Sequence, residues 1–290
     1  PRPIDSVGLY IPSGSAPLIS SVLMLAIPAQ LAQCPQRILC SPANKFGQID
    51  PHILITAELC GISQVFKVGG AQAIAAMAYG TETVPKVAKI FGPGNAWVTT
   101  AKTLVAQDPQ GAMIDMPAGP SELMVISDDS ANPKYIAADL LAQAEHGPDS
   151  QVMLISPSMS QIEQVKIAVV QQTKNALRRS IIEKALSHAR FIKVEHLDSA
   201  FAIANEYAPE HLMLQVHLPQ HHRAKIRNAG AVFLGSWSAE TMGDYVTGAN
   251  HVLPTAGFAR AASGLSVLDF IKFISFQTIS PVGLKVAGPY

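Results

Sequence analysis

Short β-branched runs alternate with helical patterns along most of the chain, and this rhythm limits the folds open to it. In the first part, the strand-like runs lie at 7–11, 37–40, 64–68 and 87–91. Each of these runs precedes a helical stretch, at 17–33, 51–60, 72–78 and 95–105. Strands separated by helices in this way predict a parallel sheet covered by helices on both faces.

A segment rich in proline and glycine, 116–121, interrupts this rhythm and predicts a domain boundary. The pattern then restarts with strand-like runs at 122–127, 151–155, 190–194, 211–215 and 231–235. Helical patterns lie between and after them, at 133–146, 159–186 in two pieces, 197–207 and 220–228.

We therefore predict an α/β fold made of two doubly wound, Rossmann-like parallel-sheet units in series. The first unit is expected at 1–120 and the second at 121–266. The remaining segment, 267–290, begins with a helix-like stretch at 268–275 and then loses its pattern. The two units show no sequence repeat, so any similarity between them is one of architecture.

Composition narrows the class of protein. Hydrophobic residues make up 48% of the 290 residues and charged residues only 14%, which predicts a large core and a subunit interface. The net charge is zero and no basic run is present, which argues against a nucleic-acid partner. The longest apolar stretch, 18–32, is too interrupted to span a bilayer, and no signal peptide is visible. Three scattered cysteines without a CxxC pair indicate buried thiols in a reducing cytosol.

The segment Gly92-Pro93-Gly94-Asn95 is the nearest candidate for a dinucleotide fingerprint. It follows a strand and opens a helix, but the third glycine of GxGxxG is missing, so the fingerprint fails. The exposed N–H groups of the helix start could still bind phosphate. A plain strand-to-helix turn explains the residues equally well, and the same holds for the junction at 68–72.

Three places in the second unit carry residues suited to metal or acid-base chemistry. Gln143 and His146 are three apart near a helix end, so they share one face and could be metal ligands. Taken alone, His146 is explained as well by the favourable helix dipole. Glu210 and His211 could form a water-activating carboxylate and a general base. Because neighbours in a strand point to opposite faces, both can serve one substrate only if the backbone near Pro209 is irregular. The simpler alternative is a surface Glu beside a half-buried His.

The third place is the segment 243–251, which we expect to be a loop bracketed by glycines. Asp244 in this loop is a candidate third metal ligand, although an Asx turn would also explain it. His251 is a candidate substrate contact.

Together, these motifs resemble the histidinol dehydrogenase family. The resemblance covers Pro3 to about Phe270, in the family's order. It is carried by the strings VGLYIPSGSAP, VGGAQAIAAMAYGTE, KIFGPGNAWVT, IDMPAGPSE, AQAEHGPDSQ, YAPEHL and GDYVTGANHVLPT.

The resemblance implies a cytoplasmic enzyme that oxidises L-histidinol to L-histidine through the aldehyde, with NAD as acceptor and one Zn²⁺ per subunit. Gln143, His146 and Asp244 match the family's zinc ligands. His211 matches the general base for the hydroxyl, and Glu210 matches the carboxylate that activates water for the aldehyde step. The zinc ligands and His211 would also contact the substrate. The metal would act mainly as a template that orients it.

The remaining matches divide between the two units. Ser121 and His251 match substrate contacts in the second unit, while Tyr10, Gln72 and Asn95 match NAD contacts in the first. The family is a homodimer in which the partner supplies a fourth zinc ligand, a histidine, from near its C-terminus, with a glutamate just before it that also serves the substrate. The chain ends at Tyr290, before either, and it also lacks the family's N-terminal helical segment, so we expect a weaker zinc site.

One residue departs from the family's pattern. Ser13 stands where a glycine is usual, which bears on the nucleotide site. Two other functions stay open: a relative that oxidises another small alcohol on the same scaffold, and an inactive fragment that serves as a binding or assembly module.

Overall fold

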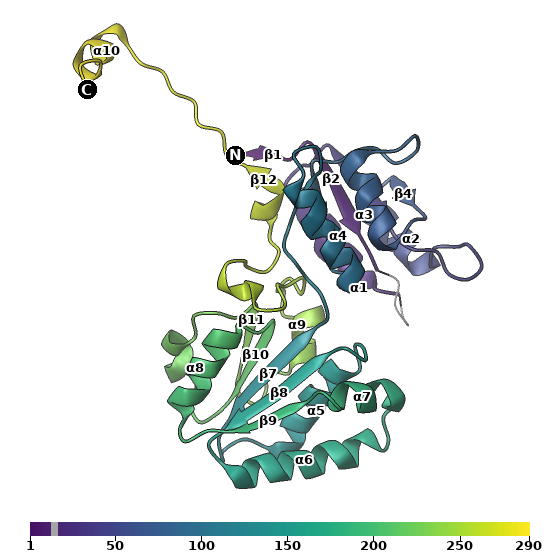
Figure 1. Cartoon of the computed structure of the whole chain (residues 1–290), viewed down its shortest axis with the longest axis vertical. Helices are drawn as coiled ribbons and strands as arrows, with labels where there is room; N and C mark the ends of the chain where they lie inside the picture. The colour runs from purple at the N-terminus through teal and green to yellow at the C-terminus, as the bar shows by residue number, and fades with distance from the viewer. Residues whose placement is uncertain (13–16) are drawn as a thin grey trace.

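The computed structural model describes residues 1–12 and 17–290 and contains two five-stranded parallel sheets, one in each half of the chain (Figure 1). Ser13 lies outside the described residues. The strand order of the first sheet is β4-β3-β2-β5-β6. Its strands are β2 (Ser6–Tyr10), β3 (Gln36–Cys40), β4 (Gln64–Phe66), β5 (Lys89–Phe91) and β6 (Met113–Ile114).

Helices cover both faces of the first sheet. They are α1 (Ile19–Leu31), α2 (Pro51–Leu59), α3 (Gly70–Tyr79) and α4 (Ala96–Gln107). Because side chains alternate along a strand, Leu9 of β2 packs with α1 and α2, whereas Tyr10 packs with α3 and α4. Helix α2 begins where Asp50 accepts a hydrogen bond from the N–H of His52, with Pro51 at the first helical position.

The second sheet has the order β11-β10-β7-β8-β9. Its strands are β7 (Glu122–Ser127), β8 (Gln151–Ser156), β9 (Arg190–Lys193), β10 (His211–Gln215) and β11 (Ala231–Leu234). The helices that follow them are α5 (Pro133–Ala144), α6 (Met159–Thr173), α7 (Arg179–Leu186), α8 (Leu197–Tyr207) and α9 (Glu240–Tyr245). One core lies between the sheet and α5, α6 and α7, and the other lies under α8.

The two sheets share one topology. Counted within its own unit, each has its strands in the order third, second, first, fourth, fifth. This arrangement confirms the predicted α/β fold with two doubly wound parallel sheets. The predicted division into 1–120, 121–266 and 267–290 stays a prediction.

Several local elements differ from those predicted. Strand β6 was not expected, because two residues are too few for a periodic pattern. The stretch predicted as a helix at 220–228 forms a 3₁₀ helix instead, Pro219–Lys225. None of its residues is buried, so no apolar face stabilises a longer α-helix there.

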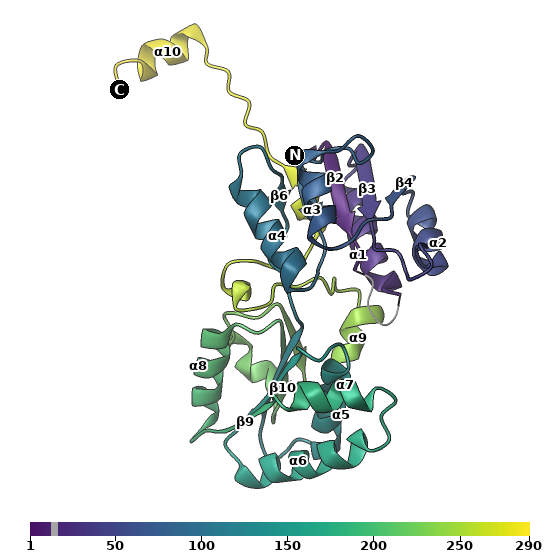
Figure 2. The same cartoon turned by 45° about the vertical axis from the view of Figure 1, so that its right-hand side comes forward.

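The C-terminal segment also differs from its expected helix at 268–275. A 3₁₀ turn, Val267–Phe270, leads into β12 (Ile271–Lys272), which pairs with β1 (Arg2–Pro3). Phe270 is fully buried in the first unit and stacks on Phe91 with ring centroids 3.9 Å apart. Beyond β12, an extended stretch carries α10 (Pro281–Ala287) away from both units (Figures 1 and 2).

The two sheets meet end to end. The strands of the first sheet point their carboxyl ends toward the second unit, and the amino ends of the second sheet face back toward the first (Figure 1). Helix α9 lies at this junction beside α5 (Figure 2). Within residues 1–12 and 17–290, no helix combines the length and the apolar character that spanning a membrane requires.

Candidate active site at the junction of the two units

The predicted pair Glu210 and His211 lies where the chain enters β10. Ala208, two residues before Glu210, has a left-handed backbone, with φ of 56°, and β10 begins only at His211. Glu210 therefore precedes the regular strand, and the pleat does not force the two side chains to opposite faces. This is the backbone irregularity that the proximity of Pro209 predicted.

The Glu210 carboxylate is buried and is held from β7. Its Oε2 accepts hydrogen bonds from the Ser121 hydroxyl at 2.6 Å and from the N–H of Glu122 at 2.8 Å. Burial is the largest influence on this group and raises the pKa of Glu210 to about 8. The structure thus brings Ser121, a predicted substrate contact, directly onto the predicted water-activating carboxylate.

The His211 imidazole is also buried, and its hydrogen bond defines which nitrogen is free. Nδ1 lies 3.1 Å from the carbonyl oxygen of Glu122, which can only accept, so Nδ1 carries the proton. Nε2 is left with its lone pair, 3.9 Å from Oε1 of Glu240. Burial lowers the pKa of His211 to about 4, so the ring is neutral at pH 7 and able to accept a proton at Nε2.

The end of α5 lies beside α9. Gln143 is in the last turn of α5, and His146 follows the helix end. Nε2 of His146 lies 3.9 Å from Oδ2 of Asp244 on α9. The side chain of Gln143 is completely buried, and neither its Oε1 nor its Nε2 has a hydrogen-bond partner in the described parts of the chain.

Asp244 lies on a helix and not in the loop that the sequence analysis expected. Residues 240–245 form α9, which places Glu240 one turn before Asp244 on the same face. Sequence reasoning missed Glu240. The spacing of the two acids could have pointed to it, but Gly243 suggested a loop, in which such spacing carries no meaning.

Glu240 contributes a second buried group without partners. It is 1% exposed, and within residues 1–12 and 17–290 neither carboxylate oxygen has a hydrogen-bond partner. Its oxygen, one from Asp244 and a nitrogen of His211 all lie within 4.8 Å of one another. Burial raises the pKa of Glu240 to about 8.

This donor set fits a divalent metal ion. An amide oxygen, an imidazole and carboxylates are ligands that Zn²⁺ accepts, and buried polar atoms without partners are costly unless a ligand satisfies them. Asp139 on α5 adds to the negative charge: its Oδ1 accepts from the N–H of Glu240 at 3.2 Å, and burial raises its pKa to about 6. A cation would relieve this excess of buried acid.

His251 faces the same cluster. Its Nε2 is buried, and no hydrogen-bond partner for it is found in the described residues. Burial lowers its pKa, and the charges of Asp244 and His146 act on it. The predicted substrate contact is therefore close to the predicted zinc ligands, although its contact with a substrate stays a prediction.

The residues predicted to contact NAD lie at the carboxyl edge of the first sheet. Tyr10 ends β2, Gln72 is in the first turn of α3 and Asn95 immediately precedes α4. The Tyr10 hydroxyl accepts a hydrogen bond from the N–H of Gly70 at 3.0 Å, which ties it to the start of α3. Oδ1 of Asn95 accepts from the N–H of Val98 at 3.1 Å, which leaves its amide NH₂ for a ligand. Two helix starts at one edge suit a pyrophosphate.

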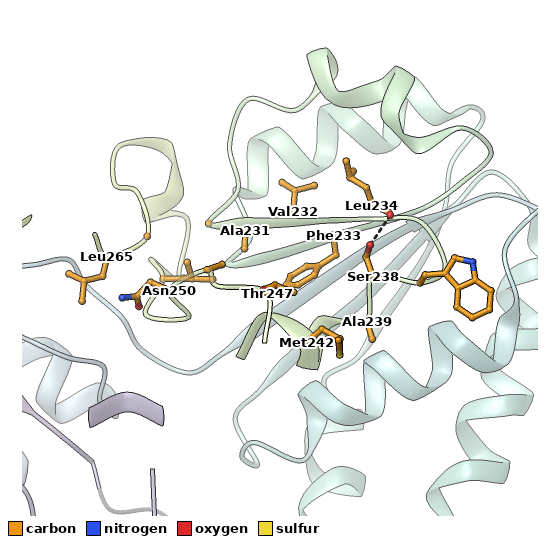
Figure 3. Close-up of a pocket in the computed structure, with 15 residues that line it drawn as sticks. Ala231, Val232, Phe233, Leu234, Ser238, Ala239, Met242, Thr247, Asn250 and Leu265 are labelled. Atoms are coloured by element: carbon orange, nitrogen blue, oxygen red, sulfur yellow. Dashed lines mark hydrogen bonds between the residues drawn. The ribbon is translucent and has the colours of Figure 1, made fainter. Parts of the chain in front are cut away.

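A pocket of about 650 Å³ is lined by residues of β11 and α9 (Figure 3). Phe233 of β11 and Met242 of α9 line it, and none of the predicted site residues does. Phe233 connects this pocket with the proposed catalytic pair, because its ring centroid lies 6.0 Å from that of His211.

The fold defines the general class of the protein. The structure of 1-pyrroline-5-carboxylate dehydrogenase from Thermus thermophilus superposes with a TM-score of 0.62 over 93% of this chain and 65% of that one, at 10% identity. At that identity the likeness concerns the fold alone. The chain is thus a two-unit α/β protein with the fold of that dehydrogenase and a buried polar cluster at its junction.

Closer comparisons define the family. The model of the histidinol dehydrogenase family matches residues 1–290. Histidinol dehydrogenase from Legionella pneumophila is 56% identical over 289 residues, which are 99% of this chain and 67% of that protein. The crystal structure of histidinol dehydrogenase from Elizabethkingia anophelis has a TM-score of 0.94 at 51% identity and covers 99% of this chain and 66% of that one.

The chain belongs to the histidinol dehydrogenase family and spans about two thirds of the length of the relatives it matches. This confirms the resemblance carried by the sequence motifs. It assigns the chain to the dehydrogenases and to histidine biosynthesis.

Proposed function

We propose that this protein oxidises L-histidinol to L-histidine in two NAD-dependent steps, with one Zn²⁺ per subunit. The observation that carries the proposal is the convergence at one junction of a neutral buried base, His211, a buried carboxylate, Glu210, and metal donors without partners. We further propose a cytoplasmic homodimer in which the partner subunit completes the active site.

Gln143, His146 and Asp244 would hold the zinc ion. When bound, the metal supplies a positive centre that can fix the imidazole and amine of the substrate. His251 is close enough to Asp244 to be influenced by its charge, and the Ser121 hydroxyl donates to Glu210, so both could help to position the substrate. A substrate held here would have its hydroxyl near the free nitrogen of His211.

His211 would take the hydroxyl proton at Nε2. The tautomer is set in advance, because Nδ1–H donates to the Glu122 carbonyl and leaves Nε2 free on the side of Glu240. The protonated ring would be stabilised by Glu240, whose Oε1 lies 3.9 Å from Nε2.

Glu210 would act in the second oxidation. The aldehyde must gain an oxygen from water before it can lose a second hydride, so a base must take a proton from that water. A carboxyl group with a pKa of about 8 is strong enough as a base for this and is held in place by Ser121. Tyr10, Gln72 and Asn95 would hold the nucleotide at the facing edge of the first sheet.

These separate roles predict that substitutions of the two bases impair different steps of the reaction. Glu210→Gln should keep the alcohol step and lose the second oxidation, whereas His211→Asn should impair the alcohol step itself. Each loss should be about 10²–10⁴-fold, as is usual for general acid-base catalysis. Pre-steady-state NADH formation from histidinol and from histidinaldehyde separates the steps, with the exposed Glu195→Gln as control. Equal losses in both half-reactions for Glu210→Gln would refute the assignment.

A further inference from the structure

Lys102 of α4 is a buried cation that the proposed mechanism does not use. Its side chain is 1% exposed, and its Nζ donates three hydrogen bonds. The acceptors are the carbonyl of Gly92 at 2.7 Å, Oδ1 of Asp115 at 2.5 Å and the carbonyl of Met116 at 3.0 Å. All three donors of the ammonium are therefore used, and Lys102 has none left for a ligand.

Asp115 completes a clamp around one residue, Gly92. Its Oδ2 accepts from the N–H of Gly92 at 2.8 Å, while the carbonyl of Gly92 accepts from Lys102. The same carboxylate accepts from the N–H of Met116 at 2.7 Å. The ion pair thus holds Gly92 from both sides and ties it to the segment that leads into the second unit.

Gly92 needs such a clamp because its position is demanding. Its φ is +120°, and a Cβ built on it would lie 2.2 Å from the carbonyl oxygen of Tyr10. Only glycine fits so close to the end of β2. The clamp therefore sets the distance between Tyr10 and the loop 92–95.

The same loop carries Asn95, one of the three predicted nucleotide contacts, and its far end approaches another, Tyr10. Gly94 donates its N–H to the carbonyl of Ala118 at 3.1 Å, and Asn95 caps α4. Tyr10 holds the start of α3 through Gly70. A shift at Gly92 would move Asn95 relative to Tyr10, while the metal donors in the second unit would stay in place.

We infer that Lys102 and Asp115 are a positioning pair that holds the loop 92–95 in the shape needed to bind a dinucleotide; this rests on the proposed use of NAD. A buried ion pair is a poor source of stability, because well-packed apolar residues usually stabilise a core as well or better. The three hydrogen bonds that Lys102 donates instead specify the path of the loop.

The test compares binding of NADH and of zinc. Lys102→Met alone leaves Asp115 buried without its partner and risks unfolding, so the double variant Lys102→Met/Asp115→Asn, which is neutral and close in volume, is the informative one. We expect its Kd for NADH, from fluorescence titration of the zinc-loaded protein, to rise by about tenfold or more, as displaced binding groups do. Its Kd for Zn²⁺ should stay within about twofold.

Ser6→Ala is the matched control. It removes the hydrogen bond from the N–H of Ala88 to Ser6 Oγ, which is 2.9 Å long. This bond connects β2 and β5 at their amino ends, whereas Tyr10 and Gly92 lie at their carboxyl ends. The control should leave both Kd values unchanged. A folded double variant that binds NADH as tightly as the wild type would overturn this inference but not the proposed function. A wild-type protein that binds zinc but no NADH would refute the proposed nucleotide use as well.

Discussion

At the scale of single residues, the active site concentrates acids that water does not reach. Glu210 and Glu240 are both buried, and burial raises the pKa of each to about 8. Glu122 and Asp139 lie next to them with pKa values raised for the same reason. Burying these carboxyl groups in their charged form lowers the free energy of unfolding, and a bound cation or a proton offsets this loss.

Glu210 makes this cost measurable in the metal-free protein. Its ordinary pKa is 4.5 and its folded pKa about 8, so between these values the folded state keeps a proton that the unfolded state has lost. The contribution of this group to the free energy of unfolding is therefore highest below pH 4.5. It falls as pH rises from 4.5 to 8, by up to roughly 1.4 kcal/mol per pH unit. Urea unfolding from pH 5 to 8 should show wild type losing stability relative to Glu210→Gln. The exposed Glu58→Gln should run parallel to wild type. Parallel curves for Glu210→Gln would mean that the carboxyl is not buried as described.

At the scale of elements, two helices face each other and carry most of the metal donors. The end of α5 supplies Gln143 and His146, and α9 supplies Glu240 and Asp244. Helix α9 has only six residues, so its position depends on packing and not on its own stability. Phe233 of β11 provides that packing, since a Cβ on Gly243 would lie 2.8 Å from its ring.

This arrangement predicts a role for Glu240 that the sequence motifs did not reveal. Glu240→Gln keeps the shape of the side chain but removes a carboxylate close to Asp244 and His211. We expect the Kd for Zn²⁺, measured by competition with a chelator, to rise about 10–100-fold, as for other groups that support metal ligands. Met242→Leu on the same helix, which faces the pocket of about 650 Å³, should leave the Kd unchanged. An unaltered Kd for Glu240→Gln would exclude the residue from the metal centre.

At the scale of the whole molecule, the edge predicted to bind the nucleotide faces the metal and acid-base cluster because the two sheets meet end to end (Figure 1). The segment 115–122 crosses between them, from the clamp at Gly92 to the Ser121 hydroxyl on Glu210. Phe270 returns to the first core from the other end of the chain and stacks on Phe91. The distance between the edge predicted to bind the nucleotide and the proposed catalytic pair therefore depends on contacts between residues far apart in sequence.

The alternation of β-branched runs with helical patterns predicted both sheets because this signal is local. The central strands β7 and β10 are buried along their whole length, as such apolar runs indicate. The facing of α9 toward α5 was not predictable, since it depends on Phe233 and on tertiary contacts that no local pattern reports. Gln143, His146 and Asp244 could be named from motifs. Glu240 was missed, because its spacing from Asp244 carries meaning only on a helix, and a loop was expected there. Its burial without hydrogen-bond partners among the described residues is visible only in the three-dimensional structure.

The central claim is that one junction carries out two successive oxidations of histidinol. The most direct test is the amount of NADH formed when a limiting amount of L-histidinol is consumed by the zinc-loaded protein with excess NAD. The account predicts two NADH per histidinol and histidine as the only product, because in the proposed mechanism His211 would serve the alcohol step and Glu210 the aldehyde step. One NADH per histidinol with accumulation of the aldehyde, or no NADH at all, would contradict it.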